Sequence, residues 1–131
     1  QNRSQLVRIP MVKGDNCRME LRSPDPACNP YLAIGLVLAA GLDGIEHRMV
    51  LQPPVNKNLF RPGEAEGLGL EMLPATLEEA VAIAEESDFL HKVLPEELSR
   101  RYFAEERARC EALRAAADPA EYERIHYFNA I

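Results

Sequence analysis

The 131-residue sequence has no tryptophan, only 6% aromatic residues, and three cysteines, Cys17, Cys28 and Cys110, none of them in a CxxC pair. An odd number of isolated cysteines favours free thiols in a reducing compartment over a disulfide framework. No basic segment followed by an apolar one opens the chain, so no secretory signal is visible and we expect a cytoplasmic protein. The longest uncharged apolar run, residues 29–42, is shorter than the roughly 18 residues that indicate a membrane span, so we expect no membrane partner.

Charge is plentiful but unevenly distributed. The formal net charge is −6, yet residues 1–30 hold five basic and three acidic residues, while the remainder holds 10 basic and 18 acidic ones. A basic opening on an acidic protein indicates a local anion site rather than a nucleic-acid surface. The arginines are not interleaved with aromatic residues, which also weighs against nucleic acid as a partner.

The order of the segments predicts an α+β fold, a short antiparallel β-hairpin followed by a mainly helical segment. Two alternating segments read as strands, and the "KGDN" stretch between them supplies turn residues. The two prolines of "SPDP" end the second strand. We expect strands at about 6–13 and 16–22, and helices at about 30–45, 77–86, 88–93, 95–116 and 119–129.

The helix expected at 30–45 is apolar on nearly every side. Asn29 is suited to cap it, and Pro30 to occupy its first position. Gly41 and Gly44 suggest its end. A helix without a polar face is normally buried all round, and a lone two-stranded hairpin is marginal in water. We therefore expect this chain to be the end of a larger protein whose sheet continues upstream.

The rest of the chain reads as one long loop followed by capped helices. Residues 47–72 show no sustained periodicity, which favours a functional or mobile loop. Thr76 and Glu79 form a capping-box pattern, and Asp118 is placed to cap the last helix in the same way. In the last helix, Tyr122, Ile125 and Phe128 form an apolar stripe.

The segment "CRMELR" alternates apolar and charged residues. Successive side chains of a strand point to opposite faces, so Arg18, Glu20 and Arg22 should share one face and the apolar residues the other. This face is either a solvated sheet surface or one wall of a site for an anion. Arg3 and Arg8 are close enough in sequence to join it. Arginines suit phosphate oxygens, and a carboxylate among them suits a divalent cation bound with those phosphates.

The stretches "NRSQLVRIP", "RMELRSPDPACNPYLAIGLVLAAGLDGIE", "NKNLF" and "LPATLEEA" resemble the C-terminal part of the glutamine synthetase catalytic domain. The resemblance implies ATP-dependent ligation of ammonia to L-glutamate through γ-glutamyl phosphate. It also implies Mg²⁺ or Mn²⁺ as cofactor and a homo-oligomeric ring with active sites at subunit interfaces. The expected partners are therefore L-glutamate, ATP and ammonia.

The resemblance also implies roles for individual residues. Arg3 would contact both glutamate and the transferred phosphate, and Arg22 would bind glutamate, so these two are the candidate catalytic residues. Arg3, Arg8 and Arg18 would bind ATP, and Glu20 would be a metal ligand. One carboxylate is too few for a metal pair, so we expect the 131 residues alone to be inactive.

Three departures from the family pattern stand out. Asp15 occupies a position where bacterial members often have a lysine that contacts ATP. Phe60 replaces the tyrosine that some bacterial enzymes adenylylate, so that control cannot act at this position. The tryptophan common before the last helix is absent.

Two alternatives remain open from the sequence. The same fold could join glutamate to an amine or a polyamine, because the acceptor pocket lies largely upstream of this segment in the family. The chain could also be a detached binding or assembly module without chemistry. The three histidines, His47, His91 and His126, are scattered, and we expect structural or solvated roles for them.

Overall fold

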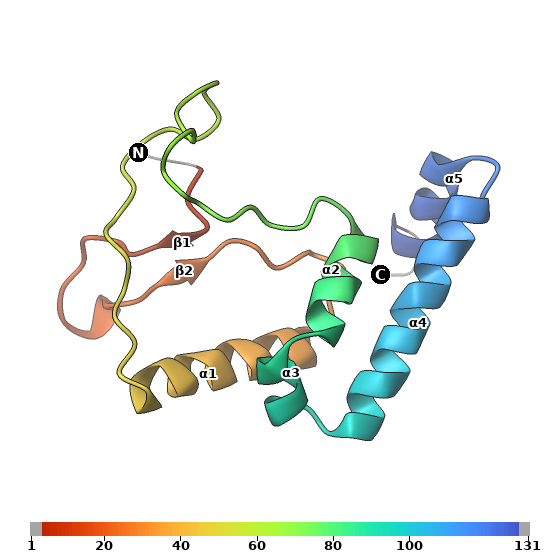
Figure 1. Cartoon of the computed structure of the whole chain (residues 1–131), viewed down its shortest axis with the longest axis horizontal. Helices are drawn as coiled ribbons and strands as arrows, with labels where there is room; N and C mark the ends of the chain where they lie inside the picture. Colours follow the sequence, from red (N-terminus) through yellow and green to blue (C-terminus); the bar gives the residue numbers. More distant parts are fainter. Residues whose placement is uncertain (1–3, 129–131) are drawn as a thin grey trace. The chain divides into compact units, whose positions relative to one another are not determined.

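A computed structural model describes residues 4–128 and divides the chain into two compact units, Gln1–Glu71 and Met72–Ile131. The first unit contains the strands β1 and β2 and the helix α1, and the second contains the helices α2 to α5 (Figure 1). The two strands form an antiparallel sheet. The expected α+β class, a short hairpin followed by a mainly helical segment, is confirmed.

The paired part of the hairpin is much shorter than the predicted strands at 6–13 and 16–22. β1 is Val7–Arg8 and β2 is Glu20–Leu21, with Val7 opposite Leu21 and Arg8 opposite Glu20. One further backbone hydrogen bond, from the N–H of Arg22 to the carbonyl of Leu6 (3.0 Å), extends the pairing.

The long connection between the strands explains the difference. Pro10 has no N–H to donate, so a ladder cannot continue through it. Instead of a tight hairpin turn, the chain forms the 3₁₀ turn η1 (Gly14–Asn16), where Gly14 has a φ of 66°. A positive φ is readily accessible to glycine because it lacks a Cβ. The "KGDN" stretch therefore does turn the chain, but inside a wide loop.

The helix α1 (Pro30–Glu46) begins as the sequence predicts. The Oδ1 atom of Asn29 accepts hydrogen bonds from the N–H groups of Tyr31 (3.0 Å) and Leu32 (3.3 Å). These bonds satisfy two of the donors that have no partner within the helix. The helix continues past Gly41 and Gly44, the residues expected to mark its end.

The end of α1 is set by Arg48, which has a φ of 51°. The N–H of Met49 donates to the carbonyl of Gly44 (2.9 Å), and the N–H of Arg48 donates to that of Ile45 (3.1 Å). This pair of bonds is the Schellman motif, whose left-handed residue is usually glycine. Here an arginine occupies that position.

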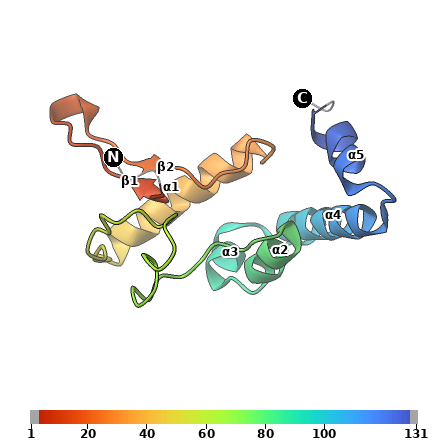
Figure 2. The same ribbon diagram turned by 90° about the horizontal axis from the view of Figure 1, so that it is seen from above.

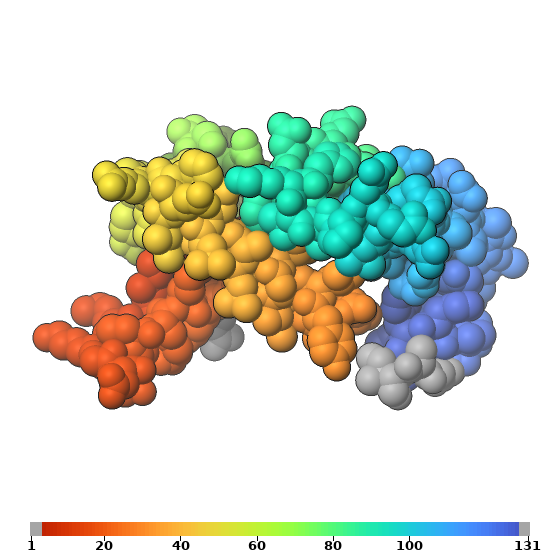
Figure 3. Space-filling model, turned by 90° about the horizontal axis from the view of Figure 1, so that it is seen from below, coloured from red at the N-terminus to blue at the C-terminus, as the bar shows by residue number. Residues whose placement is uncertain are grey.

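The expectation that α1 is buried all round is wrong for this chain. None of its residues is buried, and Tyr31 and Ile45 are 87% and 76% exposed. The apolar side chains at β2 are also open, since Met19, just before the strand, is 63% exposed and Leu21, within it, is 36% exposed. Figure 3 shows the orange and yellow atoms of α1 at the molecular surface. A two-residue strand pair and an irregular loop offer too little surface to enclose a helix that is apolar on every side.

The second unit is a small helical assembly. The helices α2 (Leu77–Glu85), α3 (Asp88–Val93) and α4 (Glu96–Ala115) match the predicted ranges to within one residue. α2 packs on α4 and runs in the opposite direction, as Figures 1 and 2 show. Glu78 pairs with Arg114, and Glu85 pairs with Arg107. Val81 and Phe103, from these two helices, are the buried apolar residues within the range 4–128.

The last helix differs from the predicted range of 119–129. α5 (Pro119–Glu123) passes into the π-helical turn η2 (Arg124–Phe128), and residue 129 lies outside the described residues. A π-helix bonds residues five apart, so it shifts which residues share a face. Tyr122 and Tyr127 are accordingly half-buried, whereas Phe128 is 80% exposed. The expected stripe of Tyr122, Ile125 and Phe128 is therefore wrong.

The helix starts of the second unit follow their caps. Thr76 Oγ1 accepts from the N–H of Glu79 (3.1 Å), and the carboxylate of Glu79 accepts from the N–H of Ala75 (2.8 Å). Asp118 caps α5 in the same way, accepting from Glu121 (3.1 Å). None of the helices described between residues 4 and 128 combines the length and apolarity needed to cross a membrane.

Candidate anion-binding site

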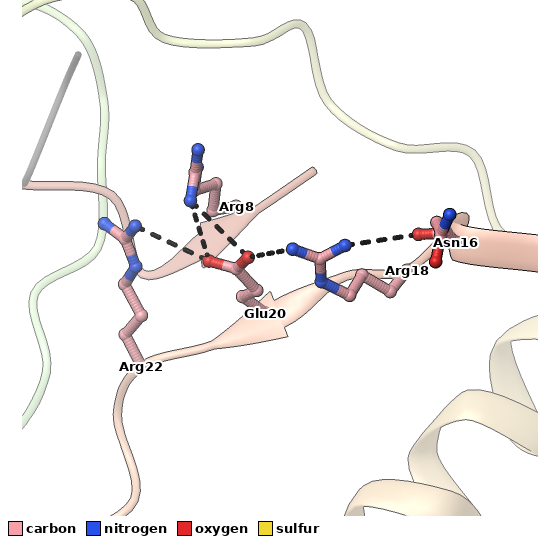
Figure 4. A network of polar contacts seen from close by, with 5 residues as sticks. All are labelled: Arg8, Asn16, Arg18, Glu20 and Arg22. Carbon is pink, nitrogen blue, oxygen red and sulfur yellow. Dashed lines mark hydrogen bonds and ion pairs between the residues drawn. The ribbon is translucent and has the colours of Figure 1, made fainter. Parts of the chain in front are cut away.

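The hairpin brings three arginines around one carboxylate. Arg18 and Arg22 lie two residues to either side of Glu20, so the alternation of the strand places all three on one face. The strand register puts Arg8 directly opposite Glu20. Figure 4 shows the three guanidinium groups directed toward the Glu20 carboxylate. The prediction that Arg18, Glu20 and Arg22 share one face, joined by Arg8, is confirmed.

The three contacts with Glu20 are unequal. Arg8 Nη1 lies 3.1 Å from Oε2 and 3.4 Å from Oε1, and donates a hydrogen bond to each oxygen. Arg18 Nη2 donates to Oε1 at 3.3 Å, and its Nη1 donates to the carbonyl of Asn16 at 3.3 Å. Arg22 Nη2 lies 3.7 Å from Oε2, an ion pair without a hydrogen bond. Arg22 is therefore the least engaged of the three.

The cluster of Arg8, Arg18, Glu20 and Arg22 carries an excess of positive charge. The hydrogen bond from Arg8 and the nearby charges of the three arginines lower the pKa of the Glu20 carboxyl below its ordinary value, although partial burial opposes this. Glu20 is therefore ionised at neutral pH, and three cations face one anion. The side chains remain accessible, at 37%, 54% and 34% exposed for Arg8, Arg18 and Arg22. An exposed cationic cluster of this kind suits a phosphate or a carboxylate.

The cluster does not form a metal site by itself. Glu20 is its single carboxylate, and both of its oxygens contact guanidinium groups. Among the residues that the structure describes, no group of three or more His, Cys, Asp or Glu side chains is arranged to hold a metal ion. Divalent cations in phosphate sites are held by one or two carboxylates plus phosphate oxygens. Glu20 fits such a site as one ligand, provided that phosphates and further ligands come from elsewhere.

The other residues singled out from the sequence lie in different settings. Arg3 lies outside the described residues. Asp15 is exposed in the turn η1. Phe60 is 74% exposed in the long loop. His47, His91 and His126 each lie within 3.0 Å of a nearby backbone carbonyl, in agreement with structural roles.

One contact of this region was not expected from the sequence. The Ser4 hydroxyl, just before β1, accepts a hydrogen bond from the N–H of Leu59 in the loop at 3.0 Å. The two residues are 55 positions apart. No periodic pattern or local motif signals a contact between such distant residues. Both "NRS" and "NKNLF" belong to the stretches that carry the family resemblance, but the resemblance does not indicate a contact between them.

Comparison with known proteins identifies the family. A family profile described as "Glutamine synthetase, catalytic domain" matches residues 1–125. A glutamine synthetase of Methanosarcina mazei is 41% identical over 126 residues, covering 95% of this chain and 28% of the relative. One from Methanocaldococcus jannaschii is 42% identical over 118 residues, covering 88% of this chain and 26% of the relative.

A more distant relative agrees with these two. A glutamine synthetase of Staphylococcus aureus is 35% identical over 129 residues, covering 97% of this chain and 28% of the relative. The chain thus spans little more than a quarter of the length of the curated relatives that it matches. The profile and the relatives together show that this chain belongs to the glutamine synthetase family and corresponds to part of its catalytic domain.

Proposed function

We propose that this chain contributes part of the active site of a glutamine synthetase, which ligates ammonia to L-glutamate at the expense of ATP. The γ-carboxylate of glutamate attacks the terminal phosphorus of ATP and ADP leaves. Ammonia then displaces phosphate from the resulting γ-glutamyl phosphate. The observation that carries the proposal is the exposed cluster of three guanidinium groups around Glu20 on one face of the hairpin.

The unequal contacts of the cluster support separate roles for its arginines. Arg8 and Arg18 are held by hydrogen bonds, so their positions are well determined, as is useful for holding the phosphates of ATP. Arg22 makes no hydrogen bond to Glu20 and so keeps its fork of donors for an incoming carboxylate, which suits glutamate. Arg3, which precedes this region in sequence, would contact both substrates. Arg3 and Arg22 remain the candidate catalytic residues.

Glu20 would supply one carboxylate ligand to a divalent cation, Mg²⁺ or Mn²⁺, which would help to offset the charge that develops during phosphoryl transfer. Without a cation, the carboxylate of Glu20 still repels phosphate locally, although the three arginines leave the cluster with a net positive charge.

A single carboxylate cannot complete the site. We therefore propose that catalysis needs residues beyond these 131, in line with the much greater length of the relatives. The apolar faces of α1 and β2 are uncovered here, which is consistent with packing against further structure. In the intact enzyme we propose a homo-oligomeric ring and a cytoplasmic location, which suits the three free thiols.

The test is steady-state kinetics on the full-length enzyme with ATP, glutamate and ammonia. The variant Glu20→Gln should lower kcat/KM by at least about 100-fold, the order expected when a charge-stabilising group leaves a catalytic site. Glu97→Gln is the matched control, because Glu97 also pairs with two arginines but lies in α4. Glutamine formation that is unaffected by Glu20→Gln would contradict the assigned role.

The acceptor and the need for further residues are tested separately. Replacing ammonia with a panel of primary amines and polyamines shows which acceptor gives the higher kcat/KM. An amine preferred over ammonia would point to the amine ligases of the same fold. Calorimetry on the 131-residue chain should show neither turnover nor tight binding of Mg²⁺ and ATP. Micromolar binding that depends on Mg²⁺ would instead favour an autonomous binding module.

A further inference from the structure

A hydrogen-bonded contact joins the long loop to the strand that carries the cluster. The Oγ atom of Ser4 accepts from the N–H of Leu59 at 3.0 Å in a partly buried setting. The same hydroxyl donates toward the carbonyl of Lys57 at a longer 3.5 Å. A hydroxyl can accept and donate at once, so one side chain contacts the loop backbone on both sides of Asn58.

The loop segment that Ser4 contacts leads directly into a compact turn. The side chain of Asn58 accepts from the N–H of Phe60 at 3.2 Å, and the carbonyl of Asn58 accepts from the N–H of Arg61 at 3.0 Å. These short-range bonds give the turn its shape but do not attach it to the hairpin. The bond from Leu59 to Ser4 supplies such an attachment.

On the other side of the contact, the chain is tied to the cluster. Two residues after Ser4, the carbonyl of Leu6 accepts from the N–H of Arg22 at 3.0 Å. Two residues further on, Arg8 hydrogen-bonds Glu20. Ser4 therefore lies between the loop and the arginine cluster, and it is adjacent in sequence to Arg3. Displacing this backbone would move the anchor point of Arg8.

We propose that Ser4 is a positioning residue that fastens the loop segment 57–59 to the strand carrying Arg8 and so holds the phosphate-facing arginines in place for a nucleoside triphosphate. The inference rests on the proposed function for its effect on the substrate. The tether itself stands on the described hydrogen bonds.

The expected size of the effect follows from the loss of the 3.0 Å hydrogen bond with Leu59, because the 3.5 Å contact with Lys57 is at the limit of hydrogen-bond distance and adds little. Such a bond contributes about 0.5–1.5 kcal/mol net, which corresponds to about a 2- to 13-fold change in an equilibrium. Ser4→Ala should therefore raise the population of the opened loop by about this factor. In this proposal only the closed form holds the arginines in place, so the KM for Mg²⁺-bound ATP should rise by the factor by which the closed population falls, with a smaller change in kcat.

Limited proteolysis of the full-length enzyme measures the tether without relying on activity. Trypsin cleaves after Lys57, whereas the neighbouring bond after Arg61 is followed by Pro62 and resists trypsin. Cleavage of a native protein tracks the population of its open form when opening and closing are fast. The rate of cleavage after Lys57, followed by mass spectrometry, should rise about 2- to 13-fold in Ser4→Ala.

Two further variants complete the design. Ser4→Thr keeps the hydroxyl and should restore both the slow cleavage and the low KM. Ser23→Ala removes another serine hydroxyl from an exposed position of the first unit and should change neither. Equal cleavage after Lys57 in Ser4→Ala and the wild type would overturn the tether. Cleavage after Lys57 that saturating Mg²⁺-bound ATP does not slow in the wild type would overturn the positioning role, because a ligand that needs the closed form must reduce the open population. A wild-type enzyme without ligase activity would count against the proposed function, while the cleavage comparison would still decide the tether.

Discussion

Replacing Arg22 with alanine in the full-length enzyme removes the guanidinium that is least engaged by Glu20. Its Nη2 lies 3.7 Å from the carboxylate, against 3.1 Å for Arg8 and 3.3 Å for Arg18. Removing it should therefore leave the two hydrogen-bonded arginines in place. If Arg22 binds the carboxylate of glutamate, the affinity for glutamate should fall much more than the affinity for ATP.

The magnitude follows from the exposure of the side chain. Truncating one partner of a buried, hydrogen-bonded charge pair costs about 2–5 kcal/mol. The Arg22 side chain is 34% exposed, so water screens part of the interaction and the low end applies. About 2 kcal/mol corresponds to a roughly 30-fold weaker affinity. Arg22→Lys keeps the charge but loses the bidentate fork, so it should fall between alanine and the wild type.

Separate titrations with glutamate and with Mg²⁺-bound ATP measure the two affinities. We expect the Kd for glutamate to rise about 30-fold and the Kd for ATP to change by less than about threefold. Arg101→Ala is the control, because Arg101 is an exposed arginine of α4 that pairs with Glu97. If Arg22→Ala lost affinity only for ATP, or lost affinity equally for both substrates, the division of roles among the three arginines would be refuted.

Three further predictions concern ionisation, stability and regulation. Because the hydrogen bond from Arg8 is the largest cause of the lowered pKa of Glu20, Arg8→Ala should raise that pKa, as measured by NMR titration of the carboxyl. An unchanged titration midpoint of Glu20 in Arg8→Ala would contradict this cause. Since the pKa of Glu20 is lowered in the folded state, the cluster stabilises the fold above the unfolded pKa. This stabilisation is lost as the pH falls through the folded pKa, below about pH 4.5. Arg48→Gly should raise the unfolding free energy by up to about 1 kcal/mol, because a left-handed conformation costs less for glycine; a lower melting temperature would show that the arginine side chain stabilises the helix end. Phe60 is 74% exposed but has no hydroxyl. An adenylylating enzyme with labelled ATP should therefore leave the wild-type loop unlabelled and should label the variant Phe60→Tyr. Label on the wild-type loop would contradict the assignment of Phe60 to the position of the modified tyrosine.

The parts of the fold that were predictable depend on near neighbours in sequence. The caps Asn29, Thr76 and Asp118 were read correctly, because a cap bonds to backbone groups two or three residues away. The common face of Arg18 and Glu20 was predictable for the same reason, since the period of a strand is set by its backbone geometry.

The errors arose where distant segments or unusual backbone geometry decide the outcome. The apolar pattern of α1 indicated burial, but burial requires a partner surface, and the first unit does not provide one. The π-helical turn η2 moved the inward position from Phe128 to Tyr127. A pattern based on the ordinary helical period cannot anticipate that shift.

The sequence by itself determined the order of the elements, the starts of α1, α2 and α5, and the alternation that puts three charged side chains of one strand on a single face. These features rest on backbone geometry and on bonds between residues a few positions apart. Only the tertiary structure decided that Arg8 lies opposite Glu20, that Arg22 is less engaged than its neighbours, and that Ser4 holds the loop at Leu59. The first and the last depend on the register or contact of separate segments, 12 and 55 positions apart, and the second depends on side-chain geometry that no sequence pattern encodes. The alignment of such segments is set by the packing of the whole unit and leaves no periodic signal in the sequence.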